Sequence, residues 1–456
     1  MMPAIKTQLG PLALATLALL SGNARAQESE VPAAPAEPAA SANPSDAALE
    51  TLKKFQRFDA LAEHDLSVKL PPTIDSLWRD VGGWRSALAE HDISLTGRTS
   101  ISLAYDVLEN NRPARPQVYN GQKYTVTTVT QDFILGIGLG RVGLPNSQFL
   151  FGGQINHSSW LPTGPDIARV KTLAYYQSFR DGAIQLKAGW IPNYREYIGI
   201  FAGGNPFLAN GLSGIVPVQV GLSADPATTP AVNVSITSKN GTYFKGGIQR
   251  STSPLGQLYE VKHNGFGLNF GSRRASALYI GEVGKRQAPA PDKREIWVRA
   301  GAIYNTSDYS SFKDSSFRSN TGAYALGDYQ VSQISRSEPY RGLFIGASAM
   351  YADPKVNVSS KYYELRTYAL GLFNARPSDA ILFSVAYTGY SNDAHRYLIP
   401  SGVKSPRGQV QVTTSYTFHV IPGVYLTSSL TYLDHPAFGG DYRDGLVAAL
   451  TLFVSH

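Results

Sequence analysis

The sequence contains no cysteine among its 456 residues. This absence excludes disulfide bonds, zinc–thiolate centres and iron–sulfur clusters. Charge is also scarce, because Asp, Glu, Lys and Arg make up only 16% of the chain, compared with ~25% in soluble domains. No uncharged apolar run approaches the ~20 residues that a membrane-spanning helix requires. Neither a large soluble helical protein nor a helical membrane protein therefore fits the composition.

Patterns typical of catalysis and of nucleic-acid binding are missing as well. The eight histidines are scattered, and neither an H-E-x-x-H zinc motif nor a G-x-S-x-G nucleophile elbow occurs. Residues 138–143 fit G-x-G-x-x-G, but Pro145 and a strand-like run follow where a dinucleotide site needs a helix. No block of like charges suggests a nucleic-acid partner. We expect no enzyme activity, no metal and no cofactor; the alternative is a hydrolase assembled across strands, with His419 as the residue to check.

The N-terminus has the pattern of a secretory signal peptide. Lys6 supplies a positive charge, residues 9–20 form a short apolar run, and residues 24–26 (Ala-Arg-Ala) provide an A-x-A cleavage site. We therefore expect residues 1–26 to be a signal peptide. The alternative is an uncleaved anchor, for which the apolar run is too short.

A low-complexity linker and a short helix are predicted next. Residues 27–46 are rich in Pro and Ala, which is typical of a flexible linker. In residues 47–64 apolar side chains recur every three positions, which predicts a short amphipathic helix. This helix either mediates oligomerisation, rests against the periplasmic mouth of the β-barrel predicted below, or is a frayed periplasmic extension. The members of the apolar stripe are Leu49, Leu52, Phe55, Phe58 and Leu61.

From about residue 93 the hydrophobic period changes from three to two. Between residues 409 and 420 the odd positions carry Gln, Thr, Ser and His, whereas the even positions carry mostly Val, Tyr and Phe. Such alternation is typical of a strand with water on one side and lipid or core on the other. It recurs at residues 295–302, where Glu295 and Arg299 share one face. Because charges face lipid only at a high cost, we expect that face to line a lumen.

Short turns and longer polar loops separate these strands. Asn240-Gly241 is a strong two-residue hairpin signal, and residues 180–182 and 421–423 have the chemistry of tight turns. Short turns at one end and long loops at the other are typical of outer-membrane barrels. We therefore predict an all-β fold, a transmembrane antiparallel outer-membrane β-barrel of 16 strands, with 18 as the alternative. Residues 65–456 would form this barrel, behind the short helical extension.

A soluble β-sandwich or propeller would also alternate. The number of strands is too large for one sandwich, and no repeat of ~40 residues suggests propeller blades. Tyrosine and tryptophan lie near the ends of several predicted strands, as in the aromatic girdle of a membrane barrel. The girdle candidates are Tyr105, Trp190, Tyr304, Tyr390 and Tyr432.

Several stretches, in order along the chain, resemble one porin family. Residues 82–93 (GGWRSALAEHDI) are similar to its entry into the first strand, and residues 186–192 (LKAGWIP) to its L-x-x-G-x-x-x-P strand. The most extensive likeness runs over residues 304–379 and ends in an R-P-x-D turn. Residues 432–436 (YLDHP) resemble its Y-x-x-N-P before the last strand. Over about residues 80–456 the chain thus resembles the OprB-type carbohydrate-selective porins.

The resemblance implies a function. It implies an exported protein of the Gram-negative outer membrane that lets mono- and oligosaccharides diffuse passively into the periplasm. Its partners would be small carbohydrates and outer-membrane lipid, with a homotrimer as one assembly to consider and no nucleic acid. The alternatives from other classes are a polysaccharide export conduit and a general, non-selective ion porin.

The candidate site for substrates lies in the long segment 192–230, the third outer loop by strand count. In porins such a loop can fold inward and narrow the lumen, and this one mixes charged, amide and aromatic groups. The candidates from the loop are Asn193, Tyr194, Arg195, Glu196, Tyr197, Asn205 and Phe207. Strand charges that we expect to point inward add Arg98, Lys187 and Arg299. The alternative is a surface lid without substrate contact, in which Arg195 and Glu196 pair with each other.

Overall fold

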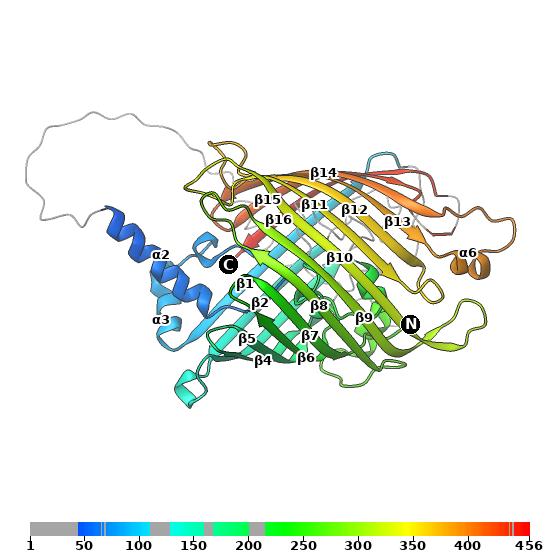
Figure 1. The fold of residues 1–456 in the computed structure, drawn as a ribbon, viewed down its shortest axis with the longest axis horizontal. Helices are drawn as coiled ribbons and strands as arrows, with labels where there is room; N and C mark the ends of the chain where they lie inside the picture. Colours follow the sequence, from blue (N-terminus) through cyan, green and yellow to red (C-terminus); the bar gives the residue numbers. More distant parts are fainter. Residues whose placement is uncertain are drawn as a thin grey trace, which may run out of the picture. The chain divides into compact units, whose positions relative to one another are not determined.

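The computed structural model describes residues 44–64, 66–67, 70–109, 128–158, 167–199, 215–436, 438–439 and 442–456. Sixteen strands of these residues form one closed antiparallel barrel, in which neighbours in sequence pair and β1 pairs with β16 (Figure 1). The predicted fold class and strand number are confirmed, and the alternative of 18 strands is wrong. The strands are β1 (Ile93–Asp106), β2 (Thr128–Gly138), β3 (Ser147–Ser158), β4 (Ile167–Phe179), β5 (Ile184–Ile191), β6 (Thr229–Thr237), β7 (Thr242–Arg250), β8 (Ala277–Gln287), β9 (Ile296–Ser310), β10 (Phe317–Gln333), β11 (Gly342–Ala352), β12 (Ser359–Leu370), β13 (Ala380–Tyr390), β14 (Gly408–Ile421), β15 (Val424–Asp434) and β16 (Gly445–Ser455).

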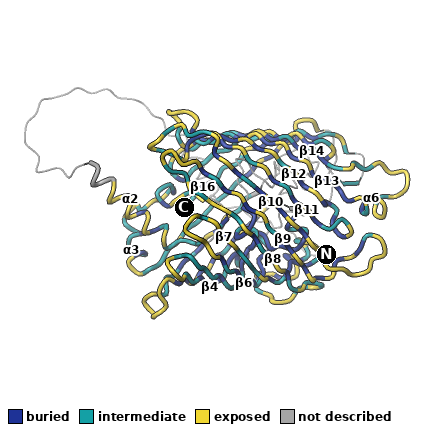
Figure 2. The backbone as a smooth tube through the Cα atoms, viewed as in Figure 1, coloured by how far each residue is buried: buried dark blue, intermediate teal, exposed yellow. Residues whose placement is uncertain are grey.

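Alternation of side chains gives the barrel two different faces. Along β9, Trp297 and Arg299 are buried, whereas Val298 between them is 46% exposed. Along β14, Gln409, Gln411, Thr413 and Ser415 are likewise buried. The same switch between buried and exposed positions is visible along the strands in Figure 2. Polar groups therefore face inward and apolar groups face outward, as a barrel with lipid outside requires.

The predicted tight turns all lie at one end of the barrel, called the near end below. The 180–182 turn joins β4 to β5, Asn240-Gly241 joins β6 to β7, and the 421–423 turn joins β14 to β15. Gly241 and Gly423 both have positive φ, at 80° and 77°, a conformation that glycine adopts without strain. Helix α3 (Trp84–Glu90), which leads into β1, and the C-terminus lie at this same end (Figure 1).

Short helices complete the fold. They are α2 (Pro44–Ala60), α4 (Ile215–Gln219), α5 (Gln257–His263) and α6 (Asn392–Leu398), with single 3-10 turns η1 (Thr73–Asp75), η2 (Val81–Gly83), η3 (Gly140–Val142) and η4 (Asn193–Arg195). The G-x-G-x-x-G stretch therefore forms η3 between two strands. Among the described residues, no helix is both long enough and apolar enough to cross a bilayer.

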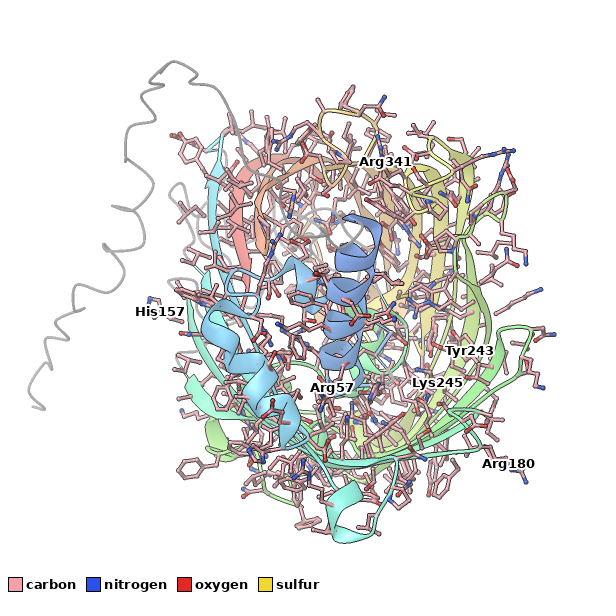
Figure 3. All side chains as sticks on the ribbon, turned by 90° about the vertical axis from the view of Figure 1, so that its left-hand side faces the viewer. Arg57, His157, Arg180, Tyr243, Lys245 and Arg341 are labelled. Atoms are coloured by element: carbon pink, nitrogen blue, oxygen red, sulfur yellow. The ribbon has the colours of Figure 1, made fainter. Side chains whose placement is uncertain are left out.

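The predicted amphipathic helix exists with shifted boundaries. Helix α2 begins before residue 47 and ends before residue 64. Residues 51–456 form one compact unit, whereas residues 1–50 form another. Within the larger unit, Phe55 and Phe58 are buried together with Ala89 of α3. Figure 3 views the barrel from the near end, where Arg57 of α2 lies in front of the opening. Its guanidinium donates to the Ala89 carbonyl at 2.8 Å.

Candidate functional site

The segment that joins β5 to β6, residues 192–228, is called the third loop below, and its described parts, residues 192–199 and 215–228, lie within the barrel. Asn193, fully buried in η4, donates to the side chain of Gln249 on β7 at 2.9 Å. Asn233 on β6 donates to the side-chain oxygen of Asn193 at 2.7 Å, and the Tyr197 hydroxyl donates to Asn233 at 3.1 Å. Asn233 and Gln249 face inward, because Val232 and Ile248 beside them are exposed. The start of the loop is therefore fixed to the inner wall.

The next residues reach further around the wall. The Ile198 amide donates to the carboxylate of Glu282 on β8 at 3.0 Å. Arg299 on β9 donates to the carbonyl groups of both Ile198 and Gly199. Arg299 also lies 3.8 Å from the centroid of the Trp297 ring, an arrangement typical of a cation–π contact. The described part of the loop that ends at Gly199 thus spans the inner faces of β6 to β9.

The returning part of the third loop packs against the opposite strands. Val216 and Val220 are buried in an apolar cluster with wall residues that include Tyr324 and Tyr362. Asn305 on β9 donates to the Val220 carbonyl at 2.5 Å. Helix α4 contacts β10, β11 and β12. Contacts with inward-facing residues of so many strands mean that the described parts of the loop lie inside the barrel.

A cluster of paired charges joins the third loop to the strands β1, β2, β4 and β5. Arg195 of the loop lies 2.7 Å from Asp225, and Lys171 on β4 lies 3.8 Å from the same carboxylate. Asp132 on β2 pairs with Lys171 and with Arg98, the latter at 2.8 Å. Pairing satisfies buried charges that would otherwise be costly.

Lys187 on β5 is the centre of a second group in this cluster. Its ammonium lies 2.7 Å from Glu196 of the third loop and 2.9 Å from Glu63, which precedes the barrel. The two groups together, called the lumen charge cluster below, hold four cationic and four anionic side chains, so their formal charges cancel. The members are Arg98, Lys171, Lys187 and Arg195 with Glu63, Asp132, Glu196 and Asp225.

Two carboxyl groups of the cluster that lie outside the strands, Asp225 and Glu63, stay ionised at neutral pH. Burial raises the pKa of Asp225, but the Arg195 charge lowers it, and the net pKa lies below its ordinary value. For Glu63, burial is likewise outweighed by the charge of Lys187, and its pKa is lowered. Burial is the main reason that the pKa of Tyr194 rises to about 12. Within the loop, Asp225 is therefore charged and Tyr194 is neutral at neutral pH.

A second charged group lies on the strands across from the cluster. Asp328 on β10 lies 2.8 Å from Arg366 on β12 and 3.4 Å from Arg299. The rings of Phe344 and Tyr368 stack beside it with centroids 4.8 Å apart. This side of the barrel thus also combines guanidinium groups with aromatic rings.

The structure describes the positions of eight of the ten predicted site residues. Arg98, Lys187 and Arg299 point inward, as predicted for strand charges. The described residues Asn193–Tyr197 all lie inside the barrel, with η4 covering the first three. Asn205 and Phe207 lie outside the described residues. Arg195 pairs with Asp225, and Glu196 pairs with Lys187.

Four members of the lumen charge cluster were not predicted from the sequence. Asp132 and Lys171 lie within strands, and the cost of charge in lipid predicts their inward direction, as for Arg98, once the strands are delimited. Glu63 and Asp225 lie in connecting segments, where no alternation indicates direction. Their roles depend on how two separate segments fold into the same lumen.

The contacts of the R-P-x-D turn, residues 376–379, are those of a structural element. Arg376 lies 2.9 Å from Asp379. Asp379 accepts a hydrogen bond from the His419 amide at 2.9 Å and one from the Tyr416 hydroxyl at 2.7 Å. The turn between β12 and β13 is thereby tied to β14, at the near end and outside the third loop.

Comparisons with known proteins agree with the geometry. The family model described as carbohydrate-selective porin, OprB family, matches residues 83–455. A curated protein of Acinetobacter baylyi described as "Putative porin QuiX" is 23% identical over 170 residues, which cover 34% of this chain and 39% of that protein. The chain therefore aligns with about two fifths of that relative's length.

Solved structures share the barrel. The high-pH structure of Pseudomonas putida OprB has a TM-score of 0.71 at 19% identity, and covers 84% of this chain and 98% of its own. The low-pH structure of the same protein has a TM-score of 0.52 at 16% identity over the same shares of both chains. At these identities the likeness supports the fold.

Proposed function

Because the chain belongs to the OprB family of carbohydrate-selective porins, we propose that its third loop is the constriction at which sugars are selected. The protein is an outer-membrane porin for the selective passive diffusion of sugars, and it is not an enzyme. The observation that carries the proposal is the bonding of the third loop to inward-facing groups of β5 to β9. A solute that crosses the barrel must pass this loop.

The chemistry of the loop suits a sugar. A sugar presents hydroxyl groups that donate and accept hydrogen bonds, together with C–H faces that contact aromatic rings. Arg195, which is partly exposed, offers a rigid planar set of donors. The partly exposed Tyr194 adds a ring that carries a hydroxyl. Several weak contacts of this kind allow a solute to bind and also to leave, as flux requires.

The charge balance of the lumen charge cluster supports a neutral substrate. Its four positive and four negative side chains add up to no net formal charge. Lumens with an excess of one sign attract the opposite ion. A balanced and strongly polar constriction therefore favours uncharged hydroxylated solutes over salts.

The test is single-channel conductance of the refolded barrel in a planar bilayer, with glucose, larger sugars and a neutral control polyol titrated in. We expect sugars to block the conductance in a concentration-dependent way, and we expect the polyol to leave the conductance unchanged. Arg195→Ala should weaken the sugar block about tenfold, since one charge-assisted hydrogen bond contributes about 1.5 kcal/mol. Arg180→Ala is the matched control, because this exposed arginine lies in a turn at the near end (Figure 3).

Other outcomes would contradict the proposal. Steady conductance that sugars do not block would favour a general ion porin. A barrel without conductance would favour a partner-gated export conduit. Equal block in the Arg195 and Arg180 variants would place sugar selection away from the third loop.

The proposal extends to export and assembly. We infer that residues 1–26 are a signal peptide removed before insertion; determining the N-terminal residue of protein purified from outer membranes tests this. A homotrimer is the assembly that we propose to test first, by cross-linking in native membranes. Small carbohydrates and outer-membrane lipid are the remaining partners.

A further inference from the structure

A short segment in front of the barrel also enters the lumen. The described residues 61–64 and 66–67, called the strap below, follow α2 and precede the region that the family model matches. The Leu61 carbonyl accepts a hydrogen bond from the Ser94 hydroxyl of β1 at 2.6 Å. The His64 ring stacks on the ring of Tyr176, a buried residue of β4, with centroids 5.1 Å apart. The strap therefore lies along the inner wall near the mouth.

The strap is bonded directly to the third loop. The Ser67 amide donates to the Arg195 carbonyl at 2.7 Å, and the Ser67 hydroxyl donates to the Glu196 carbonyl at 2.8 Å. A Cβ on Gly199 would overlap the Ser67 carbonyl oxygen. Ser67 is only 4% exposed. The strap and the start of the third loop thus form one continuous hydrogen-bonded body.

Glu63 is the charged residue that the strap adds to the lumen. Its side chain is 6% exposed and lies 2.9 Å from the Lys187 ammonium, which also bonds the His64 carbonyl at 3.2 Å. Arg195 and Arg98 attract the same carboxylate. Without Glu63 the lumen charge cluster would hold four cations and three anions, a net charge of +1.

Contacts on both sides hold the strap in place. Before it, Asp59 accepts from the Thr73 amide at 2.9 Å and from the Thr73 hydroxyl at 2.8 Å. After it, Asp75 accepts from the Gly423 amide at 2.7 Å. The Leu77 amide donates to the Ser455 carbonyl of the last strand at 2.8 Å. Bonds on both flanks therefore hold the strap within the channel.

We propose that the strap is the near-end half of the constriction and that Glu63 sets its charge balance, so that neutral solutes are preferred over anions. The third loop supplies the outer half. The inference rests on the proposed role of the third loop, because the two bodies share the same hydrogen bonds. It assigns a specificity-determining role to a residue in front of the family-matched region.

The test is ion selectivity of Glu63→Gln, measured as the zero-current potential in a potassium chloride gradient. Glutamine keeps an oxygen that accepts from Lys187, so the fold is retained while one negative charge is lost. We expect the ratio of chloride to potassium permeability to rise roughly twofold to threefold, the effect of one unit charge felt at about 7 Å in water. The matched control is Glu90→Gln, since Glu90 is exposed on α3 and outside the cluster.

Two further variants keep the proposal open to refutation. Lys187→Gln should shift the permeability ratio in the opposite direction, and the double variant Glu63→Gln/Lys187→Gln should restore the wild-type ratio. An unchanged ratio in Glu63→Gln, or the same change in Glu90→Gln, would overturn the proposal. If Glu63→Gln leaves the permeability ratio unchanged, Arg195→Ala can still weaken the sugar block. The two proposals can therefore be refuted separately.

Discussion

Lys187 illustrates how single residues build this channel. Its ammonium faces the lumen from β5, where lipid exposure of a charge would cost ~2–4 kcal/mol near the bilayer midplane. Two carboxylates, one from the third loop and one from the strap, lie within 3 Å of it. Breaking a buried pair by removing one partner costs ~3–5 kcal/mol. One strand lysine therefore orders two separate segments inside the barrel.

Asp80 is a single residue through which we expect the stability of α3 to depend on pH. It accepts from the Arg85 and Ser86 amides at the start of α3, at 2.8 and 3.0 Å, and lies 2.6 Å from Lys54. Burial raises the pKa of Asp80, but these bonds outweigh it and lower the pKa from 3.8 to about 2. Because the folded pKa lies below the unfolded one, the stabilisation is complete above pH ~4 and lost as the pH falls toward 2.

We therefore expect Asp80→Ala to destabilise α3 by ~1 kcal/mol at neutral pH, the size of a lost helix cap. Hydrogen exchange of residues 84–90 measures this. The wild type should lose its extra protection between pH 4 and 2, whereas the variant should show no pH dependence there. Equal protection of both proteins at pH 7 would refute this account of Asp80.

At the scale of elements, the tight turns of the hairpins fix the register in which neighbouring strands pair. The β6–β7 hairpin depends on Gly241, which has a φ of 80° and no room for a Cβ beside the Arg286 carbonyl. Gly241→Ala should destabilise the barrel by at least ~1 kcal/mol. Gly281→Ala on β8 is the matched control, because a Cβ there meets open space. The thermal transition of the folded band on gel electrophoresis measures both, and equal transitions would contradict this role of the turn.

Elements were predictable where one local rule decided them. Alternation of polar and apolar residues gave the strand at 409–420, and Asn240-Gly241 gave the hairpin between β6 and β7. The end of α2 at Ala60 was not predictable, because Leu61 continues the apolar stripe while its carbonyl bonds to the Ser94 hydroxyl in the lumen. Tertiary contacts override the local pattern there.

The candidate site was predictable in part for the same reason. Inward charges such as Lys187 and Arg299 follow from the cost of charge in lipid. The partners of Arg195 do not follow from sequence, since Asp225 lies thirty residues away along the same loop and Asp132 lies on another strand. Pairing across the lumen becomes visible only once the barrel closes.

At the scale of the whole molecule, the channel separates two tasks. The outward apolar face meets lipid, and the sixteen-stranded closure leaves no free sheet edge. The inward face carries paired charges that hold the third loop and the strap inside the lumen. We propose that selectivity arises from these two segments inside the barrel, and that its electrostatic part is a balance between many side chains.

The most direct test of that balance is a liposome-swelling assay that compares three solutes of similar size, namely glucose, the anion glucuronate and the cation glucosamine. The wild-type channel should admit glucose fastest, and each charged solute should enter several-fold more slowly at low salt, because ion pairs in the constriction are weakly screened. Equal rates for all three, or a rate highest for glucuronate or glucosamine, would contradict a charge-balanced constriction that selects neutral sugars.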